Sequence, residues 1–269
     1  MNNSFDIHEL NSAVLEAAEA IRQMRNSFIV DSKNAIVDLV TNADLKSEDI
    51  LMKAITKYFP DDGIISEESD EIVSTNGRSW LIDPLDGTVN YANNIPQVAI
   101  TLTLLLNKAP VQTYIYDIFQ EDLYEGYANK GGFKNSERLQ VTKNTSLQKA
   151  IIATGFPYDR LEFGEQYIQT FLSILKSTGG VRRFGSAALD VCWVADNKFD
   201  GYYEYFIKPW DTLGASLILK EADGIVVDEH DAFPTLSSNL IIASNKSIHE
   251  DFKSLVFTNI DPDLKERFS

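Results

Sequence analysis

Trp80-Leu81-Ile82-Asp83-Pro84-Leu85-Asp86-Gly87-Thr88-Val89-Asn90 is an apolar strand that runs directly into two aspartates. Asp83-Pro84-Leu85-Asp86 has Asp and Pro at the first two positions favoured in a type I β-turn, so the pattern predicts a turn that brings both carboxylates together. Their mutual repulsion requires a cation, and hard carboxylate oxygens suit Mg²⁺. Gly87 relaxes the backbone, and Thr88 can cap a following helix whose free N–H groups would bind an anion. A metal and an anion at one turn indicate phosphate chemistry.

The composition agrees with this interpretation. The chain has 269 residues and 44% hydrophobic content, enough for one large or two medium domains. Its formal net charge is −16, from 24 Lys and Arg against 40 Asp and Glu, which disfavours electrostatic binding to nucleic acid or to an anionic membrane. A phosphate would also be repelled from an acidic pocket unless bound cations inverted the local field. The charge therefore supports the metal hypothesis, and we expect no direct nucleic-acid or membrane partner.

The cysteine and histidine content points to a reducing compartment without zinc. Cys192 is the only cysteine, and its place in an apolar helical run predicts core packing. His8, His230 and His249 are separated in sequence, form no zinc pattern and are expected on the surface. The first residues lack the basic and apolar regions of a signal peptide, and no apolar run approaches the ~20 residues needed to cross a bilayer. We expect a soluble cytoplasmic protein.

The first half of the chain mixes long helices with strands. Apolar residues recur every three or four positions from Ile7 to Phe28, which predicts an amphipathic helix, and a second helix is predicted over 42–58. Apolar or alternating runs predict strands at 64–65, 80–82, 97–106, 111–119 and 122–128. The polar, glycine-bearing segment 129–146 is the best internal boundary. We therefore predict an N-terminal α+β half at 1–145 that carries most of the metal ligands.

The second half, 146–269, alternates short strands with helices. Strands are predicted near 150–154, 181–184, 200–205, 224–228 and 240–243, and helices near 163–176, 186–195, 211–222 and 247–257. Alternation of this kind is typical of an α/β arrangement. No internal repeat or low-complexity tract interrupts it. The fold class is therefore α+β followed by α/β.

Besides Asp83 and Asp86, three segments place acids at the ends of predicted elements: Asp44, Glu67-Glu68 and Asp211. Each allows a structural interpretation. Thr41 and Asp44 have the spacing of a capping box, Glu67-Glu68 could be a solvated loop, and Asp211 could cap a helix. The pair at 83 and 86 is different, because a turn seldom needs two acids behind an apolar strand.

The combination of these segments resembles the inositol monophosphatase family of lithium-sensitive, Mg²⁺-dependent phosphatases. Residues 80–90 match the family's first signature, and Lys208-Pro209-Trp210-Asp211-Thr212-Leu213-Gly214-Ala215 is similar to its second. Gly185-Ser186-Ala187-Ala188 is similar to the family's substrate-contacting helix start, while the segments ending at Asp44 and at Ser69 fit the remaining acidic segments. The resemblance covers roughly residues 7 to 250. It implies a layered α/β/α/β/α sandwich with the metal site between the two halves.

The resemblance also implies a role for each residue. One Mg²⁺ would be held by Glu67, Asp83 and the Leu85 carbonyl, and a second by Asp83, Asp86 and Asp211. Glu67 would also help to place a weak third ion, giving two to three Mg²⁺ per subunit. Thr88 and Asp44 would orient and deprotonate the attacking water, with Glu67 as a further catalytic residue. The residues implied to contact the substrate are Asp86, Gly87, Thr88, Gly185, Ser186, Ala187, Glu204 and Asp211.

Inositol monophosphate is the first substrate that the resemblance implies. Fructose-1,6-bisphosphate, histidinol phosphate, NADP and 3′-phosphoadenosine 5′-phosphate stay open, because the metal core is shared while the selective loops cannot be read. The chain departs from the family pattern at Ser66, where Gly is usual, and over residues 91–96, which we expect at the substrate mouth.

The resemblance further implies a homodimer. Two alternatives to a phosphatase stay open. One is a regulatory protein of the transcription machinery on the same fold, and the other is a non-catalytic metal-binding module.

Overall fold

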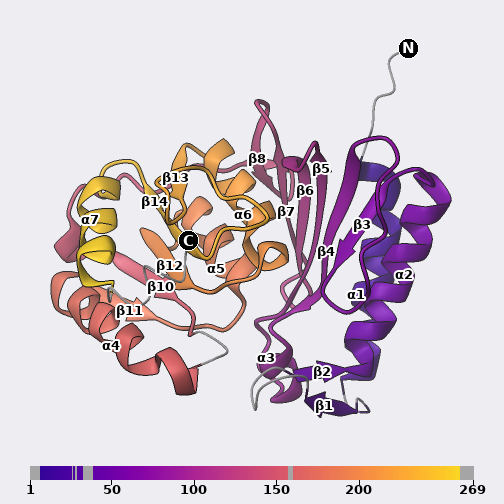
Figure 1. Ribbon diagram of the computed structural model, residues 1–269, viewed down its shortest axis with the longest axis horizontal. Helices are drawn as coiled ribbons and strands as arrows, with labels where there is room; N and C mark the ends of the chain where they lie inside the picture. Colours follow the sequence, from indigo (N-terminus) through magenta and orange to yellow (C-terminus); the bar gives the residue numbers. More distant parts are fainter. Residues whose placement is uncertain (1–6, 26, 28, 33–38, 157–159, 261–269) are drawn as a thin grey trace.

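The computed structural model describes residues 7–25, 27, 29–32, 39–156 and 160–260, which form five stacked layers (Figure 1). Helices α1 (Asn11–Met24) and α2 (Asn42–Tyr58) cover one face of a seven-stranded sheet. Helices α5 (Ala187–Ala195) and α6 (Pro209–Glu221) separate that sheet from a second, five-stranded sheet. Helices α4 (Arg160–Ser177) and α7 (His249–Asn259) form the last layer. The predicted α/β/α/β/α sandwich is confirmed.

The larger sheet is mainly antiparallel and is packed on both faces. Its order is β3-β4-β5-β6-β7-β8-β9, and only β3 and β4 pair in parallel. The strands are β3 (Gly63–Ser66), β4 (Arg78–Asp86), β5 (Ala99–Leu106), β6 (Ala109–Asp117), β7 (Asp122–Tyr127), β8 (Gly131–Lys134) and β9 (Glu137–Arg138). Along β4, Trp80 and Ile82 join the core beneath α1 and α2, whereas Leu81 packs in a cluster with Leu105 of β5 and Leu213 of α6. Successive side chains thus face opposite layers, as a strand requires.

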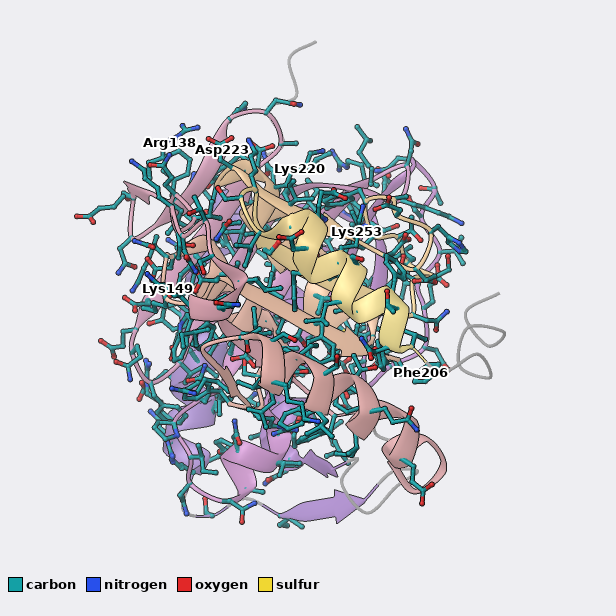
Figure 2. All side chains as sticks on the ribbon, turned by 90° about the vertical axis from the view of Figure 1, so that its left-hand side faces the viewer. Arg138, Lys149, Phe206, Lys220, Asp223 and Lys253 are labelled. Carbon is teal, nitrogen blue, oxygen red and sulfur yellow. The ribbon has the colours of Figure 1, made fainter. Side chains whose placement is uncertain are left out.

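The smaller sheet has the order β11-β10-β12-β14-β13. Its strands are β10 (Ile151–Thr154), β11 (Gly180–Arg182), β12 (Gly201–Tyr205), β13 (Gly224–Val227) and β14 (Leu240–Asn245). The first three pair in parallel, and β14 pairs antiparallel to both of its neighbours. Helices α4 and α7 lie side by side over its outer face, with Lys253 on α7 (Figure 2). The shorter elements of the chain are η1 (Ile7–Leu10), β1 (Val30–Ser32), β2 (Leu39–Thr41), α3 (Thr88–Ala92) and η2 (Leu147–Lys149).

Helix α6 contacts both sheets and fixes their distance. A Cβ at Gly214 would lie 2.3 Å from Thr103 Oγ1 and 2.5 Å from Thr113 Oγ1, so only glycine lets the helix approach the larger sheet this closely. On the other side, Leu219 lies against β13, where a Cβ at Gly224 would fall 2.3 Å from Leu219 Cδ1, and it shares a core cluster with Val226. The helix start that carries Asp211 is therefore held directly against β4 and β5.

Some sequence-based expectations are corrected. The apolar periodicity from residue 7 covers η1 and α1, which ends at Met24, and Phe28 lies outside the described residues. Segment 129–146 is not wholly a connection, because β8 and β9 add to the larger sheet there.

The histidines differ from one another. His8 and His230 are exposed as expected, but His249 is only 1% exposed, since it begins α7 facing β14 and its Nδ1 lies 2.8 Å from Ser244 Oγ. Cys192 is fully buried as predicted. Among the helices in the described part of the chain, none is long and apolar enough to cross a membrane.

Candidate active site

The predicted turn at residues 83–86 is wrong, because strand β4 continues through Asp86. Asp83 pairs with Thr101 and Asp86 pairs with Ala99. Two residues, Pro84 and Leu85, therefore lie between the paired positions on β4, against one residue on β5. This is a β-bulge, a one-residue insertion into an antiparallel pair. Pro84 explains its position, since proline has no N–H to donate to the ladder. The Leu85 amide instead donates to Asp83 Oδ1 at 2.9 Å.

The bulge achieves what the turn was expected to do. Residues three apart on a regular strand point to opposite faces, so Asp83 and Asp86 would be separated by the sheet. The extra residue in the bulge brings the Asp86 side chain back to the face of Asp83, so both side chains line one pocket. The predicted pairing of the two aspartates is thus present, although its backbone differs from the prediction.

The pocket has a volume of about 260 Å³ and lies where β4, α5, α6 and β12 meet. It brings together most of the predicted site residues: Glu67, Asp83, Leu85, Asp86, Gly87, Thr88, Gly185, Ala187, Glu204 and Asp211. Its other lining residues are Val89, Gly155, Phe156, Arg183, Asp190 and Ile207. Asp44 and Ser186 are fully buried behind this wall and reach it through hydrogen bonds to Thr88 and Asp86. Residues 91–96 do not line the pocket, so that expectation is wrong; Tyr91 is in the core and its hydroxyl donates to the Ile21 carbonyl at 2.8 Å.

Asp44 serves both as a capping residue and as a partner of Thr88. Its Oδ2 accepts the Thr41 amide at 2.9 Å in the predicted capping box of α2. Its Oδ1 lies 3.1 Å from Thr88 Oγ1, which is also 3.1 Å from the Leu85 carbonyl oxygen. Burial raises the pKa of Asp44 to about 6, against the lowering effect of these hydrogen bonds. Asp44 therefore caps α2 as predicted and still has an oxygen for Thr88.

Gly87 rather than Thr88 precedes helix α3. Gly87 has φ +98°, a left-handed conformation that glycine adopts without strain, and Thr88 is the first residue of the helix. A Cβ at Gly87 would lie 2.7 Å from the Gln97 carbonyl oxygen. Because Thr88 does not cap the helix, its hydroxyl is available to Asp44.

Asp86 is held by the first turn of α5. Its Oδ2 accepts Ser186 Oγ–H at 2.5 Å and the Ala188 amide at 2.9 Å, and its Oδ1 accepts the Ala187 amide at 3.3 Å. Burial raises the pKa of Asp86 to about 6, while these donors act in the opposite direction. Ser186, predicted as a substrate contact, instead orients this carboxylate.

Asp83 and Asp211 meet across the junction between β4 and α6. The Asp83 amide donates to Thr101 Oγ1 at 3.1 Å, and Thr101 donates to the Trp210 carbonyl at 2.9 Å. Asp211 is the third residue of α6 and not its cap; its Oδ2 accepts the Lys208 amide at 3.3 Å. One threonine thus ties together the two chain segments that carry these acids.

The electrostatics of this acidic end call for a cation. Burial raises the pKa values of Asp83 and Asp211 well above their ordinary range, and both shifts are increased by the neighbouring charges of Glu67 and Asp86. Carboxylate and carbonyl oxygens are the ligands that Mg²⁺ prefers, so the donor set fits that ion. Within the described residues, no group of three or more Asp, Glu, His or Cys side chains is gathered tightly enough to define a metal centre by spacing alone.

The opposite end of the pocket is built around Glu204 of β12. Its carboxylate accepts the Tyr202 hydroxyl and lies against Gly155, where a Cβ would fall 2.0 Å from Glu204 Oε2. Burial raises the pKa of Glu204 to about 7, opposed by the Tyr202 hydrogen bond and the charge of Arg183. Glycine at position 155 is therefore required for this carboxylate to occupy its place.

Among the buried acids that the sequence reasoning missed, Glu48 and Asp190 bear on the site. Glu48 is 4% exposed and holds the loop after β3, accepting Ser66 Oγ, Ser69 Oγ at 2.6 Å and the Glu68 amide at 3.3 Å. Asp190 is the only charged residue of α5 and lines the pocket. The available signal was the same for both, an acid on the apolar side of a predicted helix.

The fold and the site together define a protein with a small-molecule pocket, and the acidic end of this pocket lies where the two sheets are joined through α6. The sequence profile of the Inositol monophosphatase family matches residues 3–259, so this chain belongs to that family.

Individual relatives agree with the family assignment. The chain is 37% identical to an inositol-1-monophosphatase of Synechocystis sp. over 224 residues, which cover 82% of this chain and 78% of the relative. It is 34% identical to a putative Nus factor SuhB of Neisseria meningitidis serogroup B over 235 residues, 86% of this chain and 88% of the relative.

Solved structures share the fold over almost the whole chain. The extragenic suppressor protein SuhB from Bartonella henselae superposes with a TM-score of 0.88 at 29% identity, covering 93% of this chain and 97% of that one. An inositol monophosphatase from Anabaena (Nostoc) sp. superposes with a TM-score of 0.84 at 32% identity, covering 95% and 96%.

Proposed function

We propose that this protein is a Mg²⁺-dependent phosphatase that hydrolyses a small phosphomonoester, with inositol monophosphate as the first substrate. The observation that carries the proposal is one pocket in which four of the lining carboxylates, Glu67, Asp83, Asp86 and Asp211, gather with Leu85 of the bulge. The hydrogen-bonded pair Thr88 and Asp44 lies beside them. The family assignment and the inositol-1-monophosphatase relative support it.

The acidic end would hold two to three Mg²⁺ ions. Glu67, Asp83 and the Leu85 carbonyl would hold one, and Asp83, Asp86 and Asp211 a second, with Glu67 also near a weak third. When bound, Mg²⁺ would supply a lowered pKa for the attacking water and charge neutralisation for the phosphate. The chain's part is to hold these oxygens in place, which the bulge, the first turn of α5 and Thr101 do.

Thr88 and Asp44 would orient and deprotonate the water. With its proton donated to Asp44 Oδ1, the Thr88 oxygen can accept a hydrogen bond from a water in the pocket. As that water attacks phosphorus, its proton would pass to Thr88 while the threonine proton passes to Asp44. The P–O bond to the alcohol breaks at the same time, and the leaving oxygen takes a proton from solvent. The pKa of about 6 makes Asp44 a stronger base than an ordinary aspartate and still ionised at neutral pH.

The far end of the pocket would bind the part of the substrate that carries the phosphate. Tyr202 occupies Glu204 Oε2, which leaves Oε1 to accept a substrate hydroxyl. Gly185 and Ala187 line the same region without bulky side chains, so a ring can pass between α5 and β12. Gly87 and Thr88 also line the pocket, and their backbone amides would contact the phosphate.

Phosphate release from a panel of small phosphomonoesters tests the proposal, with Mg²⁺, without it, and with added millimolar Li⁺. We expect release from inositol 1-phosphate that requires Mg²⁺ and falls with Li⁺. The panel includes fructose-1,6-bisphosphate, histidinol phosphate, NADP and 3′-phosphoadenosine 5′-phosphate, any of which could prove the better substrate. No Mg²⁺-dependent release from any ester would contradict the proposal.

A second candidate is a regulatory role in transcription, because one of the similar relatives is called a putative Nus factor. The net charge of −16 favours a protein partner over direct RNA contact. Capture of RNA polymerase by wild type and by Asp83→Asn separates the candidates. Capture by both proteins, with no phosphatase activity in the wild type, would favour the regulatory role.

The quaternary state and location complete the proposal. We infer a homodimer, which sedimentation velocity checks through the mass of the particle relative to the 30.2 kDa chain. We also infer a cytoplasmic location, in keeping with a single buried cysteine, and fractionation of cells tests it.

A further inference from the structure

Asp190 lines the pocket and carries a buried oxygen that has no hydrogen-bond partner among the described residues. It is the fourth residue of α5 and is 1% exposed, and the oxygen is its Oδ1. Leaving such a group buried without a partner costs free energy, which a bound hydrogen-bond donor would recover. The site proposed above does not use it.

Asp190 differs in location from the other buried polar groups that have no hydrogen-bond partner. Within the described chain these are Gln97 Nε2, Asp190 Oδ1, Tyr203 OH, Ser216 Oγ and His249 Nε2. Of these residues only Asp190 lines the pocket. A ligand in the pocket can therefore supply the missing hydrogen bond at Asp190 and at none of the others.

The neighbours of Asp190 identify the chemistry of that ligand. Glu204 and Arg183 line the pocket together with Asp190, and the charges of Asp86, Glu204 and Arg183 all act on Asp190. The Arg183 guanidinium lies 5.9 Å from the centre of the Phe156 ring, and Ile207 adds an apolar wall. Two carboxylates that accept, one guanidinium that donates and apolar groups for ring carbons match a polyol ring with several hydroxyls. A second phosphate would fit poorly, because Asp190 and Glu204 would repel it and Arg183 is the one cation among the described residues that line the pocket.

We infer that Asp190 is a specificity-determining residue, which takes a hydrogen bond from a hydroxyl group of the polyol that carries the scissile phosphate. This inference rests on the proposed phosphatase function and names the class of its substrate. The polyol hydroxyl donates to Oδ1 while Glu204 takes a neighbouring hydroxyl. Substrates without hydroxyls there leave Oδ1 unsatisfied and gain nothing from it.

Steady-state kinetics of Asp190→Ala and Asp190→Asn on two esters test the inference. We expect Asp190→Ala to lower kcat/KM for inositol 1-phosphate at least ~10-fold more than for 4-nitrophenyl phosphate, mainly through KM, since one lost hydrogen bond is worth about a tenfold change. Asp190→Asn keeps an oxygen at this position and should restore most of the difference. Ser216→Ala is the matched control, because it removes a buried orphan oxygen outside the pocket and should change neither ester.

Thermal unfolding without metal gives a second readout. Removing an unsatisfied buried carboxyl should leave Tm unchanged or raise it, whereas the loss of a structural residue would lower it. Equal losses of kcat/KM on both esters together with a lower Tm would overturn the inference.

Failure of the proposed function would look different. In that case the wild type releases no phosphate from any ester, and calorimetric binding of inositol 1-phosphate in the presence of Mg²⁺ replaces kinetics. Binding that Asp190→Ala weakens supports the subsite, and binding that this variant leaves unchanged overturns it.

Discussion

The two ends of the pocket are built from different parts of the chain. The acidic end takes Glu67, Asp83 and Asp86 from the larger sheet and Asp211 from α6, so it exists only where these parts meet. The end around Asp190 and Glu204 comes entirely from residues after 150. The reaction thus depends on how the two sheets are joined, whereas substrate choice can change by substitution on one side only.

The ends also differ in how their carboxylates are satisfied. At the acidic end, the charges of Glu67, Asp86 and Asp211 all raise the pKa of Asp83, a repulsion that a cation removes. At the other end, Tyr202 and Arg183 act on Glu204 and lower its pKa, partly offsetting burial. In the proposed enzyme, one end would therefore hold metal, and the other would take a substrate hydroxyl.

The largest effect is expected for Asp83→Asn, which removes a carboxylate shared by both proposed ions. Mg²⁺-dependent phosphate release should fall by roughly three or more powers of ten, since bound ions supply several kcal/mol of transition-state stabilisation. Without metal, Tm should rise, because the substitution removes a buried charge that is repelled by its neighbours. Enzyme assays and thermal scans in a chelator measure the two changes.

Asp62→Asn is the control for that variant. Asp62 is also buried, but it accepts Arg78 Nε and Trp80 Nε1, each at 2.9 Å, and lies outside the pocket. Its substitution should lower Tm and leave kcat unchanged. Near-wild-type activity of Asp83→Asn would remove Asp83 from the metal site.

The second prediction concerns pH and metal. The folded-state pKa values of Asp44 and Asp86 are about 6, and that of Glu204 is about 7, all above the ordinary range for these acids. The folded protein therefore holds these protons more tightly than the unfolded chain does. The contribution of the three groups to the free energy of unfolding is fully present at low pH and is lost as pH rises through 6 to 7. At about 1.4 kcal/mol per pKa unit, Glu204 alone accounts for on the order of 3 kcal/mol.

Urea unfolding from pH 5 to 8 measures this slope. Metal-free protein should lose stability with rising pH, saturating Mg²⁺ should reduce the loss, and Glu204→Gln should make the metal-free slope shallower. A metal-free stability that rises over this range would contradict the electrostatic picture of both ends.

A smaller effect is expected for Thr101→Val, which removes the link between Asp83 and Trp210. We expect a loss of about 1–2 kcal/mol in stability and about a tenfold weaker Mg²⁺ affinity, because the Asp83 amide loses its acceptor. Thr103→Val is the matched control, since Thr103 Oγ1 lies 2.8 Å from Thr113 Oγ1, away from the acids. It should cost similar stability without changing Mg²⁺ affinity in calorimetric titrations. Equal Mg²⁺ affinities for both variants would mean that Thr101 does not position the acidic end.

The smallest effect is expected for Glu204→Gln. Because Gln keeps an oxygen but loses charge, KM for a polyol phosphate should rise by about three- to tenfold, with little change in kcat. The rise should be smaller for 4-nitrophenyl phosphate, which has no hydroxyl to donate. Equal changes for the two esters would place Glu204 outside the substrate subsite.

The family resemblance implied the layers and most of the pocket residues, whereas local sequence patterns predicted individual elements and the pair Asp83 and Asp86. Apolar periodicity identified α2, and the apolar run before Asp83 identified β4. The bulge could not be predicted, since it depends on the pairing of β4 with β5. The contact of Ser186 with Asp86 spans 100 residues, and the orphan oxygen of Asp190 depends on what surrounds it. Features set by long-range packing leave only a weak trace in the sequence.

The bulge in β4 makes chain length as important as side-chain identity at this site. Deleting either Pro84 or Leu85 would leave both aspartates in the sequence, yet a regular strand would then hold them two positions apart and draw the start of α3 back by one residue. Gly87 and Thr88 would be pulled away from Asp44 by about 3.3 Å, the rise of one strand residue. Insertions and deletions here should therefore impair the site more than most substitutions do. The spacing Asp-x-x-Asp-Gly-Thr sets the distance from the two aspartates to Thr88.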